Sequence, residues 1–165
     1  KDVVGREEAF DRIKAAVDAR EEGTDILIMG RTDDNHTHGL EEAIHRGKRY
    51  QVIGADIIFI EAPKTVAEME TICREVPGCH MANIVEGGLT PNLSMEQLQD
   101  VGFQFVAYPL TLLAASMQAM KQTLELMRQD LPRANHLMDF EELRDRIGFN
   151  EYYETSQVYE TSRRS

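Results

Sequence analysis

The sequence predicts an α/β fold built on a parallel sheet. Four short apolar runs recur along the chain, amphipathic stretches with helical spacing lie between them, and polar turn residues join one to the next. A helix between two strands returns the chain to the same end of the sheet, so the strands pair in parallel. Four such units are half of a (β/α)8 barrel, and the pattern alone leaves an open sheet as the alternative.

Composition narrows the class of protein. The chain has 165 residues, 42% of them hydrophobic and 28% charged, which is typical of one globular domain. Its net charge of -11 disfavours binding to nucleic acid or to anionic membranes, and no apolar run reaches the roughly 18 residues of a membrane span. Cys73 and Cys79 fit neither a zinc pattern nor a disulfide framework. We therefore expect no nucleic acid or membrane partner and a cytoplasmic location, with an organellar one left open.

The first two units follow directly from hydrophobic spacing. Residues 6–20 place apolar side chains three and four positions apart, which predicts a helix, and the continuous apolar run at 26–29 predicts a strand covered on both faces. Residues 40–50 repeat the helical spacing, Gly54 ends that helix, and 56–60 form the second apolar run.

Two capping patterns predict where the next helices begin. A Ser or Thr stands three residues before Glu or Gln at 65–68 and again at 94–97, the arrangement of a capping box. Each helix leads to an apolar run, at 80–85 and at 103–108, which we predict as the third and fourth strands.

The last part of the chain has a different character. A long helix is predicted from about 112 to 128, and three residues at helical spacing are expected in its core: Met117, Met120 and Met127. We divide the chain into a barrel part, 1–130, and a helical tail, 131–165. The tail is polar but rich in Tyr, so we expect it to dock on a neighbouring subunit, with a frayed terminus as the alternative.

Polar side chains stand where the predicted strands end, which is where ligands bind in parallel α/β folds. They are Arg31 after the first strand, Glu61 after the second, Asn83 with Glu86 and Gly87 after the third, and Tyr108 with Pro109 after the fourth. A guanidinium at a strand end suits a substrate carboxylate, which it can hold by two parallel hydrogen bonds. The alternative is an ion pair between Arg31 and Glu61 that joins two strands, and both can hold.

Other titratable groups are weaker candidates. His36 and His38 are half of a metal-binding pattern without a partner at suitable spacing, so we expect a solvated loop there and assign no metal ligand in this chain. Glu61 is expected to orient Arg31, to accept a substrate hydroxyl or to cap the next helix.

Five segments in order along the chain resemble the carboxyl half of the isocitrate lyase / phosphoenolpyruvate mutase superfamily. They are GRTDDNHTHGLEEAIHRGKRY, GADIIFIEAP, MANIVEGGLTP, GFQFVAYPL and FEELRDRIGFNEYY. Within the superfamily, the EGG of the third segment and the GFNEYY of the last are similar to one branch. That branch contains dimethylmalate lyase, petal death protein and carboxyvinyl-carboxyphosphonate phosphorylmutase.

The resemblance implies a fold and an activity. The fold would be the second half, about strands 5–8, of a (β/α)8 TIM-type barrel followed by C-terminal helices. Subunits would pair by exchanging these helices, and two such pairs would form a tetramer, a dimer of dimers. The activity would be Mg2+-dependent cleavage of a C–C bond, by a lyase or hydrolase, in a small 2-hydroxy or 2-keto dicarboxylate of the alkylmalate, methylisocitrate or oxaloacetate type. A phosphonomutase acting on a P–C bond and a non-catalytic half-barrel interaction module remain alternatives.

The resemblance also assigns roles to residues. Glu61 would be catalytic, and the substrate would be bound by Arg31, Asn83, Glu86, Gly87 and Pro109. The metal ligands and the catalytic Cys of the family lie upstream of the matched segments. The sequence starts with Lys1 and not with Met, so we expect a piece of a longer polypeptide that is inactive by itself.

Overall fold

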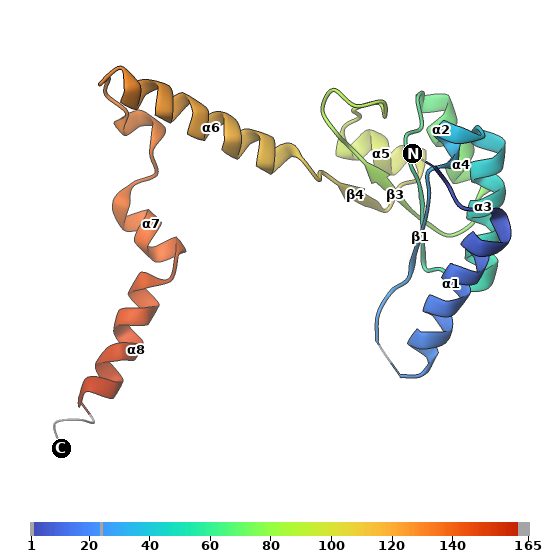
Figure 1. Ribbon diagram of the computed structural model, residues 1–165, viewed down its shortest axis with the longest axis horizontal. Helices are drawn as coiled ribbons and strands as arrows, with labels where there is room; N and C mark the ends of the chain where they lie inside the picture. Colours follow the sequence, from blue (N-terminus) through green and yellow to red (C-terminus); the bar gives the residue numbers. More distant parts are fainter. Residues whose placement is uncertain (1, 24, 162–165) are drawn as a thin grey trace. The chain divides into compact units, whose positions relative to one another are not determined.

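A computed structural model describes residues 2–23 and 25–161, and positions 1, 24 and 162–165 lie outside the described part. The sheet has four parallel strands in the order β1-β2-β3-β4 (Figure 1). They are β1 (Met29–Thr32), β2 (Ile57–Ile60), β3 (Cys79–Asn83) and β4 (Phe105–Ala107). The predicted α/β class with parallel pairing is thereby confirmed.

The helices alternate with these strands and then continue beyond them. Those of the alternating part are α1 (Arg6–Glu21), the single turn α2 (Asp34–Thr37), α3 (Leu40–Ile53), α4 (Val66–Glu75) and α5 (Met95–Val101). They are followed by α6 (Thr111–Arg128), the 3-10 turn η1 (Ala134–His136), α7 (Phe140–Arg146) and α8 (Phe149–Thr161). The chain divides into two compact units, Lys1–Ala114 and Ala115–Ser165.

The capping patterns mark the helix starts as predicted. Ser94 and Gln97 form a complete capping box at α5. At α4 the Thr65 hydroxyl accepts the Glu68 N–H at 3.1 Å, but the Glu68 carboxylate accepts the N–H of Lys64, one residue earlier than a box requires. The capping box at Thr65 and Glu68 is therefore only half formed.

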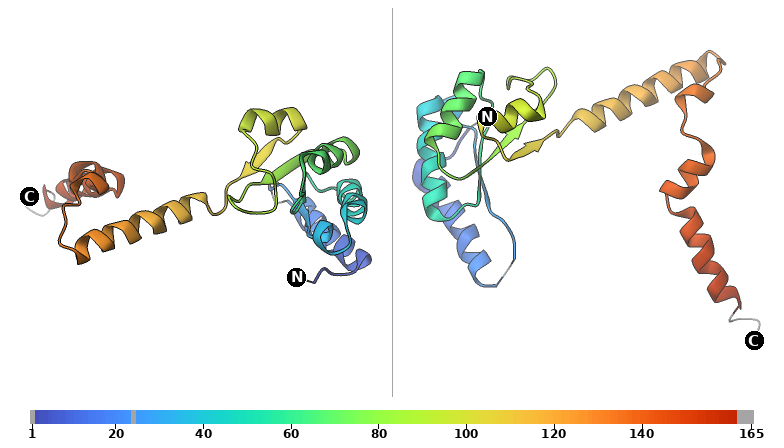
Figure 2. Two further views of the ribbon diagram at one scale, coloured as in Figure 1. Left: turned by 90° about the horizontal axis from the view of Figure 1, so that it is seen from above. Right: turned by 180° about the vertical axis from the view of Figure 1, so that it is seen from behind.

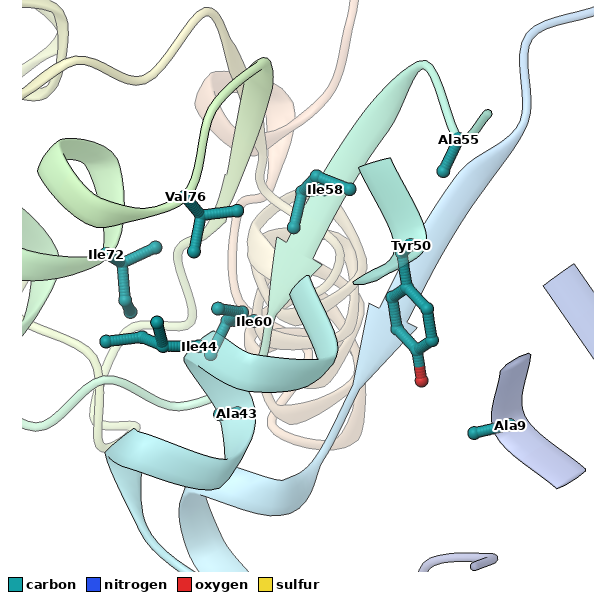
Figure 3. Packing of buried hydrophobic residues seen from close by; sticks show 9 residues of the cluster. All are labelled: Ala9, Ala43, Ile44, Tyr50, Ala55, Ile58, Ile60, Ile72 and Val76. Carbon is teal, nitrogen blue, oxygen red and sulfur yellow. The ribbon is translucent and has the colours of Figure 1, made fainter. Parts of the chain in front are cut away.

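One face of the sheet packs against helices. The strand register places one set of paired residues on this face: Gly30, Ile58 and His80. Two positions further along the strands, the same face carries Ile60, Ala82 and Val106. Helices α1, α3 and α4 lie on the same side of the strands, as the ribbon diagrams show (Figures 1 and 2). Ile58 and Ile60 belong to one buried cluster with Ile44 of α3 and Ile72 of α4, and Figure 3 shows Ile60 beside Ile44. A second cluster joins β3 to α4 and α5 through Met69, Ala82, Ile84, Leu98 and Phe103.

The packing of α3 onto β1 depends on a glycine. A Cβ at Gly30 would come within 2.8 Å of the Tyr50 ring, so a side chain there would push α3 away from the strand. Gly30 precedes Arg31, whose side chain points to the opposite face of the sheet because successive strand residues alternate. The close contact on one face thus fixes the backbone that carries Arg31 on the other.

Two expectations about burial were wrong. The run 26–29 was expected to be covered on both faces, but Ile26 and Leu27 are 51% and 67% exposed and the strand begins only at Met29. Helices α1, α3 and α4 cover one face of the sheet, and within this run only the side chain of Ile28 is buried. The three methionines of α6 were expected in a core and are 53–59% exposed, because none of the buried clusters includes this helix.

Candidate active site

Three of the strand-end side chains meet at the carboxyl edge of the sheet. Arg31 Nη2 lies 3.5 Å from Glu61 Oε2, and Asn83 Nδ2 donates to the same oxygen at 3.4 Å. The Glu61 N–H also donates to the Thr32 carbonyl at 3.0 Å, which extends the strand pairing by one residue. Glu61 therefore lies between a cation and an amide that come from the two neighbouring strands.

Asp33 holds the guanidinium of Arg31 in a fixed plane. Its carboxylate accepts hydrogen bonds from Nε at 2.9 Å and from Nη2 at 3.0 Å, and Arg31 Cζ lies 4.8 Å from the centre of the Phe59 ring. The hydrogen bonds that Arg31 donates to Asp33 are the main cause of a raised pKa of Arg31. We expected a substrate carboxylate to make these two parallel bonds, and here the chain's own Asp33 makes them. The Arg-x-Asp spacing at a strand end was the available signal for this residue.

The turn that follows Glu61 is strained. Ala62 has φ of +55°, although it is not glycine and precedes Pro63, and a residue before proline normally has φ near about -120°. A left-handed conformation costs an ordinary residue about 1–2 kcal/mol. The Ala62 carbonyl accepts a hydrogen bond at 2.9 Å from Nδ2 of Asn35, which is only 5% exposed. Sequence reasoning missed Asn35, because nothing in the pattern places it beside residue 62.

A cleft of about 280 Å³ opens beside these groups. It is lined by Asp33, His36, Thr37, Glu61, Ala62 and Leu89. His36 was expected on a solvated loop, and it does remain exposed, but it lies on the helical turn α2 and faces this cleft. The cleft therefore combines two carboxylates and an imidazole with the apolar side chain of Leu89.

The remaining predicted site residues lie apart from Glu61. Both carboxylate oxygens of Glu86 accept from the Thr111 hydroxyl, at 2.7 and 2.9 Å, and this hydrogen bond lowers the pKa of Glu86. Gly87 has φ of +77°, which explains a glycine at that turn, and Pro109 is exposed. Among the described contacts, none joins Glu86, Gly87 or Pro109 to Arg31, Glu61 or Asn83.

A buried charge network supports the turn that carries Asp33 and Asn35. Asp34, fully buried, accepts from the Thr32 hydroxyl at 2.7 Å, contacts His38 Nδ1 at 2.7 Å and pairs with Arg46 Nε at 3.0 Å. Arg46 also donates to Glu42 at 2.9 Å, and Glu42 in turn binds Arg6. The hydrogen bond from Arg6, followed by that from Arg46, lowers the pKa of Glu42 to about 2.

The described part of the chain contains neither a cluster of metal-binding side chains nor a helix that could span a membrane. In the ranges 2–23 and 25–161, no group of three or more His, Cys, Asp or Glu side chains could hold a metal ion. The two carboxylates nearest to the cleft, Asp33 and Glu61, both contact Arg31. No helix of that part is long and apolar enough to cross a membrane.

The strand-end contacts and the parallel sheet fit a known family. Residues 1–128 match the family model described as phosphoenolpyruvate phosphomutase, so the chain belongs to the phosphoenolpyruvate mutase family. It is 37% identical to 2,3-dimethylmalate lyase of Eubacterium barkeri, over 99% of this chain and 57% of that protein. It is 33% identical to petal death protein of Dianthus caryophyllus, over 96% of this chain and 51% of that protein.

A solved structure gives the same result. The crystal structure of a 2,3-dimethylmalate lyase, described as a PEP mutase/isocitrate lyase superfamily member, superposes with a TM-score of 0.84 at 29% identity. The match covers 95% of this chain and 56% of that one. The chain thus spans about half the length of the curated relatives it matches. The resemblance inferred from the sequence, including its branch, is confirmed.

Proposed function

We propose that the chain is the carboxyl half of a (β/α)8 barrel enzyme that cleaves a C–C bond in a small 2-hydroxy or 2-keto dicarboxylate. The observation that carries the proposal is the contact of Arg31, Glu61 and Asn83 at the carboxyl edge of the sheet in a chain of this family. The lyase name of the relative from Eubacterium barkeri supports the reaction class. The face of the sheet opposite α1, α3 and α4, which carries Arg31 and Asn83, would line the barrel interior.

The roles of the three residues follow from their chemistry. Arg31 uses Nε and Nη2 for Asp33 and Glu61, so we assign Nη1 to the carboxylate of the keto-acid portion of the substrate. Glu61 would act on the substrate hydroxyl, since its carboxylate is held in place by a cation and an amide and can accept a proton in the transition state. Asn83 would fix the carboxylate plane of Glu61. Glu86, Gly87 and Pro109 would border the substrate from the later loops.

We include Mg2+ in the proposal as the ion that would stabilise charge on the enolate product. Among the described residues no group of three or more His, Cys, Asp or Glu side chains could hold it. The family resemblance implies ligands upstream of this chain, and we include that location in the proposal. No step of the reaction is therefore assigned here through the metal.

The assembly is a further part of the proposal. We propose a barrel part, residues 1–130, and a helical tail, 131–165, that docks on a partner subunit in a dimer of dimers. Exposed aromatic side chains of α8, which include Tyr152 and Tyr153 at 65% and 49% exposure, supply the apolar area for this docking. The location is proposed as cytoplasmic, with an organelle as the alternative.

The test is an assay of the complete reading frame. The purified protein is given Mg2+ and, in separate reactions, 2,3-dimethylmalate, methylisocitrate and oxaloacetate, and the keto-acid or oxalate products are measured. Turnover of one of them supports the proposal. Absence of turnover with all three would reject it.

The family description favours a second candidate, a phosphonomutase that acts on a P–C bond. A 31P NMR measurement with phosphonopyruvate distinguishes it, because the phosphorus shift changes when the P–C bond becomes a P–O bond. A non-catalytic half-barrel module is the third candidate. Sedimentation of the 165-residue chain bears on it, since a single oligomer with a cooperative melt would favour the module and aggregation would count against it.

A further inference from the structure

We infer that Asn35 is a positioning residue for Glu61 and that it acts by holding Ala62 in its left-handed conformation. The inference rests on the proposed function, because it concerns the residue to which that function assigns proton transfer. Nothing in the family resemblance or in the strand-end pattern pointed to Asn35. The three observations that carry it are a strained backbone, a buried amide and a shared hydrogen-bond network.

The strained backbone is the first observation. Ala62 directly follows Glu61 and has φ of +55°, and Pro63 after it further restricts the chain. Such a conformation persists only where the surroundings hold it. If the turn relaxed to negative φ, the peptide plane after Glu61 would rotate and the Glu61 side chain would leave the position between Arg31 and Asn83.

The buried amide is the second observation. Asn35 is 5% exposed, and its Nδ2 donates to the Ala62 carbonyl at 2.9 Å. This bond spans 27 residues and joins the turn after β1 to the turn after β2. Loss of the amide would leave the carbonyl of the strained residue without the hydrogen bond that Asn35 donates to it.

The third observation is a second side chain, that of Glu68, which is hydrogen-bonded to the same turn. The Glu68 carboxylate accepts the Lys64 N–H at 2.8 Å and lies 3.4 Å from Asn35 Nδ2. The turn between Glu61 and Lys64 is thus attached at its first part by Asn35 and at its last part by Glu68. Since Asn35 alone binds the carbonyl of the strained residue in these contacts, its removal is expected to act on Glu61 first.

The test uses one substitution that removes the Asn35 amide and one that removes the backbone strain at residue 62. In the full-length protein, Asn35→Ala is expected to lower kcat roughly 10- to 100-fold with a smaller change in KM, since small displacements of a reacting group cost this much. Ala62→Gly makes the left-handed conformation available without cost. The double variant Asn35→Ala/Ala62→Gly is therefore expected to recover most of the lost kcat.

A matched control removes a similar bond elsewhere. The Gln104 side chain accepts the His80 N–H at 2.7 Å at the amino end of β3, so Gln104→Ala also loses one amide-to-backbone bond. Its kcat is expected to stay near that of the unsubstituted protein. If Asn35→Ala does not fold, Asn35→Ser is measured in its place.

The outcomes separate the inference from the proposed function. A crystal structure of the Asn35 variant reports φ of residue 62 whether or not any substrate is turned over, and negative φ is expected. Positive φ with unchanged kcat would overturn the inference, and so would a loss of kcat that Ala62→Gly does not recover. Failure of the unsubstituted protein to cleave any substrate would reject the proposed function and leave the φ measurement as the test of the inference.

Discussion

The Nη2 atom of Arg31 lies 3.5 Å from Oε2 of Glu61, across the boundary between β1 and β2. The two side chains are 43% and 21% exposed, so the pair is partly screened by water and its attraction alone adds little stability. The main effect of the pair is geometric. Asp33 fixes the plane of the Arg31 guanidinium, and the Nη2 atom of that group therefore lies at a defined position beside the Glu61 carboxylate.

The first prediction concerns that plane. Arg31→Lys keeps the positive charge but cannot donate two parallel hydrogen bonds to Asp33, and an ammonium does not lie flat on Phe59. We expect kcat/KM for the cleaved dicarboxylate to fall about 100-fold, which corresponds to about 3 kcal/mol of lost transition-state binding. Steady-state kinetics of the full-length protein measure this. The exposed Arg74→Lys serves as control, and an equal fall in that variant would contradict the assignment.

The second prediction concerns the charge of Glu61. Glu61→Gln preserves the size of the side chain and a hydrogen-bond partner for Asn83, but it cannot accept a proton. We expect kcat to fall about 10²- to 10⁴-fold, the usual contribution of a general base, with little change in melting temperature. Glu70→Gln, an exposed position on α4, should match the unsubstituted enzyme. A Glu61→Gln variant with normal kcat would remove Glu61 from the mechanism.

The third prediction concerns the buried network. Arg46 pairs with Asp34 and Glu42, and Arg46→Met would leave the Asp34 carboxylate buried without its cation. Loss of one partner from a buried pair costs about 3–5 kcal/mol, so we expect a fall of that size in the free energy of unfolding. Arg12→Met removes an exposed pair with Glu8 and should cost at most about 1 kcal/mol. Denaturant titration of both variants measures the difference, and equal effects would argue against the network.

The fourth prediction concerns pH. The pKa of Glu42 is lowered from 4.5 to about 2 in the folded protein, chiefly by the hydrogen bond from Arg6 and then by that from Arg46. A lowered carboxyl pKa stabilises the fold above the unfolded value, and that stabilisation is lost as the pH falls from about 4.5 towards 2. Since Arg6 is 56% exposed, we expect a contribution of only about 1–2 kcal/mol.

Unfolding titrations of the protein and of Glu42→Gln at neutral pH and at about pH 3 test this assignment. The stability difference between the two proteins should be largest at neutral pH and should shrink on acidification. A difference that stays constant across this range would show that Glu42 does not titrate as described.

Local patterns predicted the class of fold well, because hydrophobic spacing and capping residues act over a few positions. The capping box at Ser94 and the order of strands and helices were recognisable in this way. The local pattern did not reveal which part of the protein covers a given apolar surface. The stripe of α6 that includes Met117 has helical spacing, yet the spacing does not reveal which surface covers it, and this helix is exposed.

The candidate site shows the same division. Arg31, Glu61 and Asn83 could be chosen because parallel strands bring their carboxyl ends to one edge. Asp33 and Asn35 were not assigned, since their contacts depend on how the turn after β1 folds. The hydrogen bond between Glu86 and Thr111 could not be predicted from the sequence pattern either, because it depends on where α6 begins.

The order of the strands in the sheet repeats their order in the chain. Paired residues are accordingly close in sequence: Met29 and Ile57 are 28 positions apart, Ile57 and Cys79 are 22 apart, and Met81 and Phe105 are 24 apart. Each strand can therefore find its neighbour as soon as the intervening helix has left the ribosome, without waiting for a distant segment. Synthesis from the amino end would add this sheet one strand at a time, and each new helix would cover the strand pair just formed.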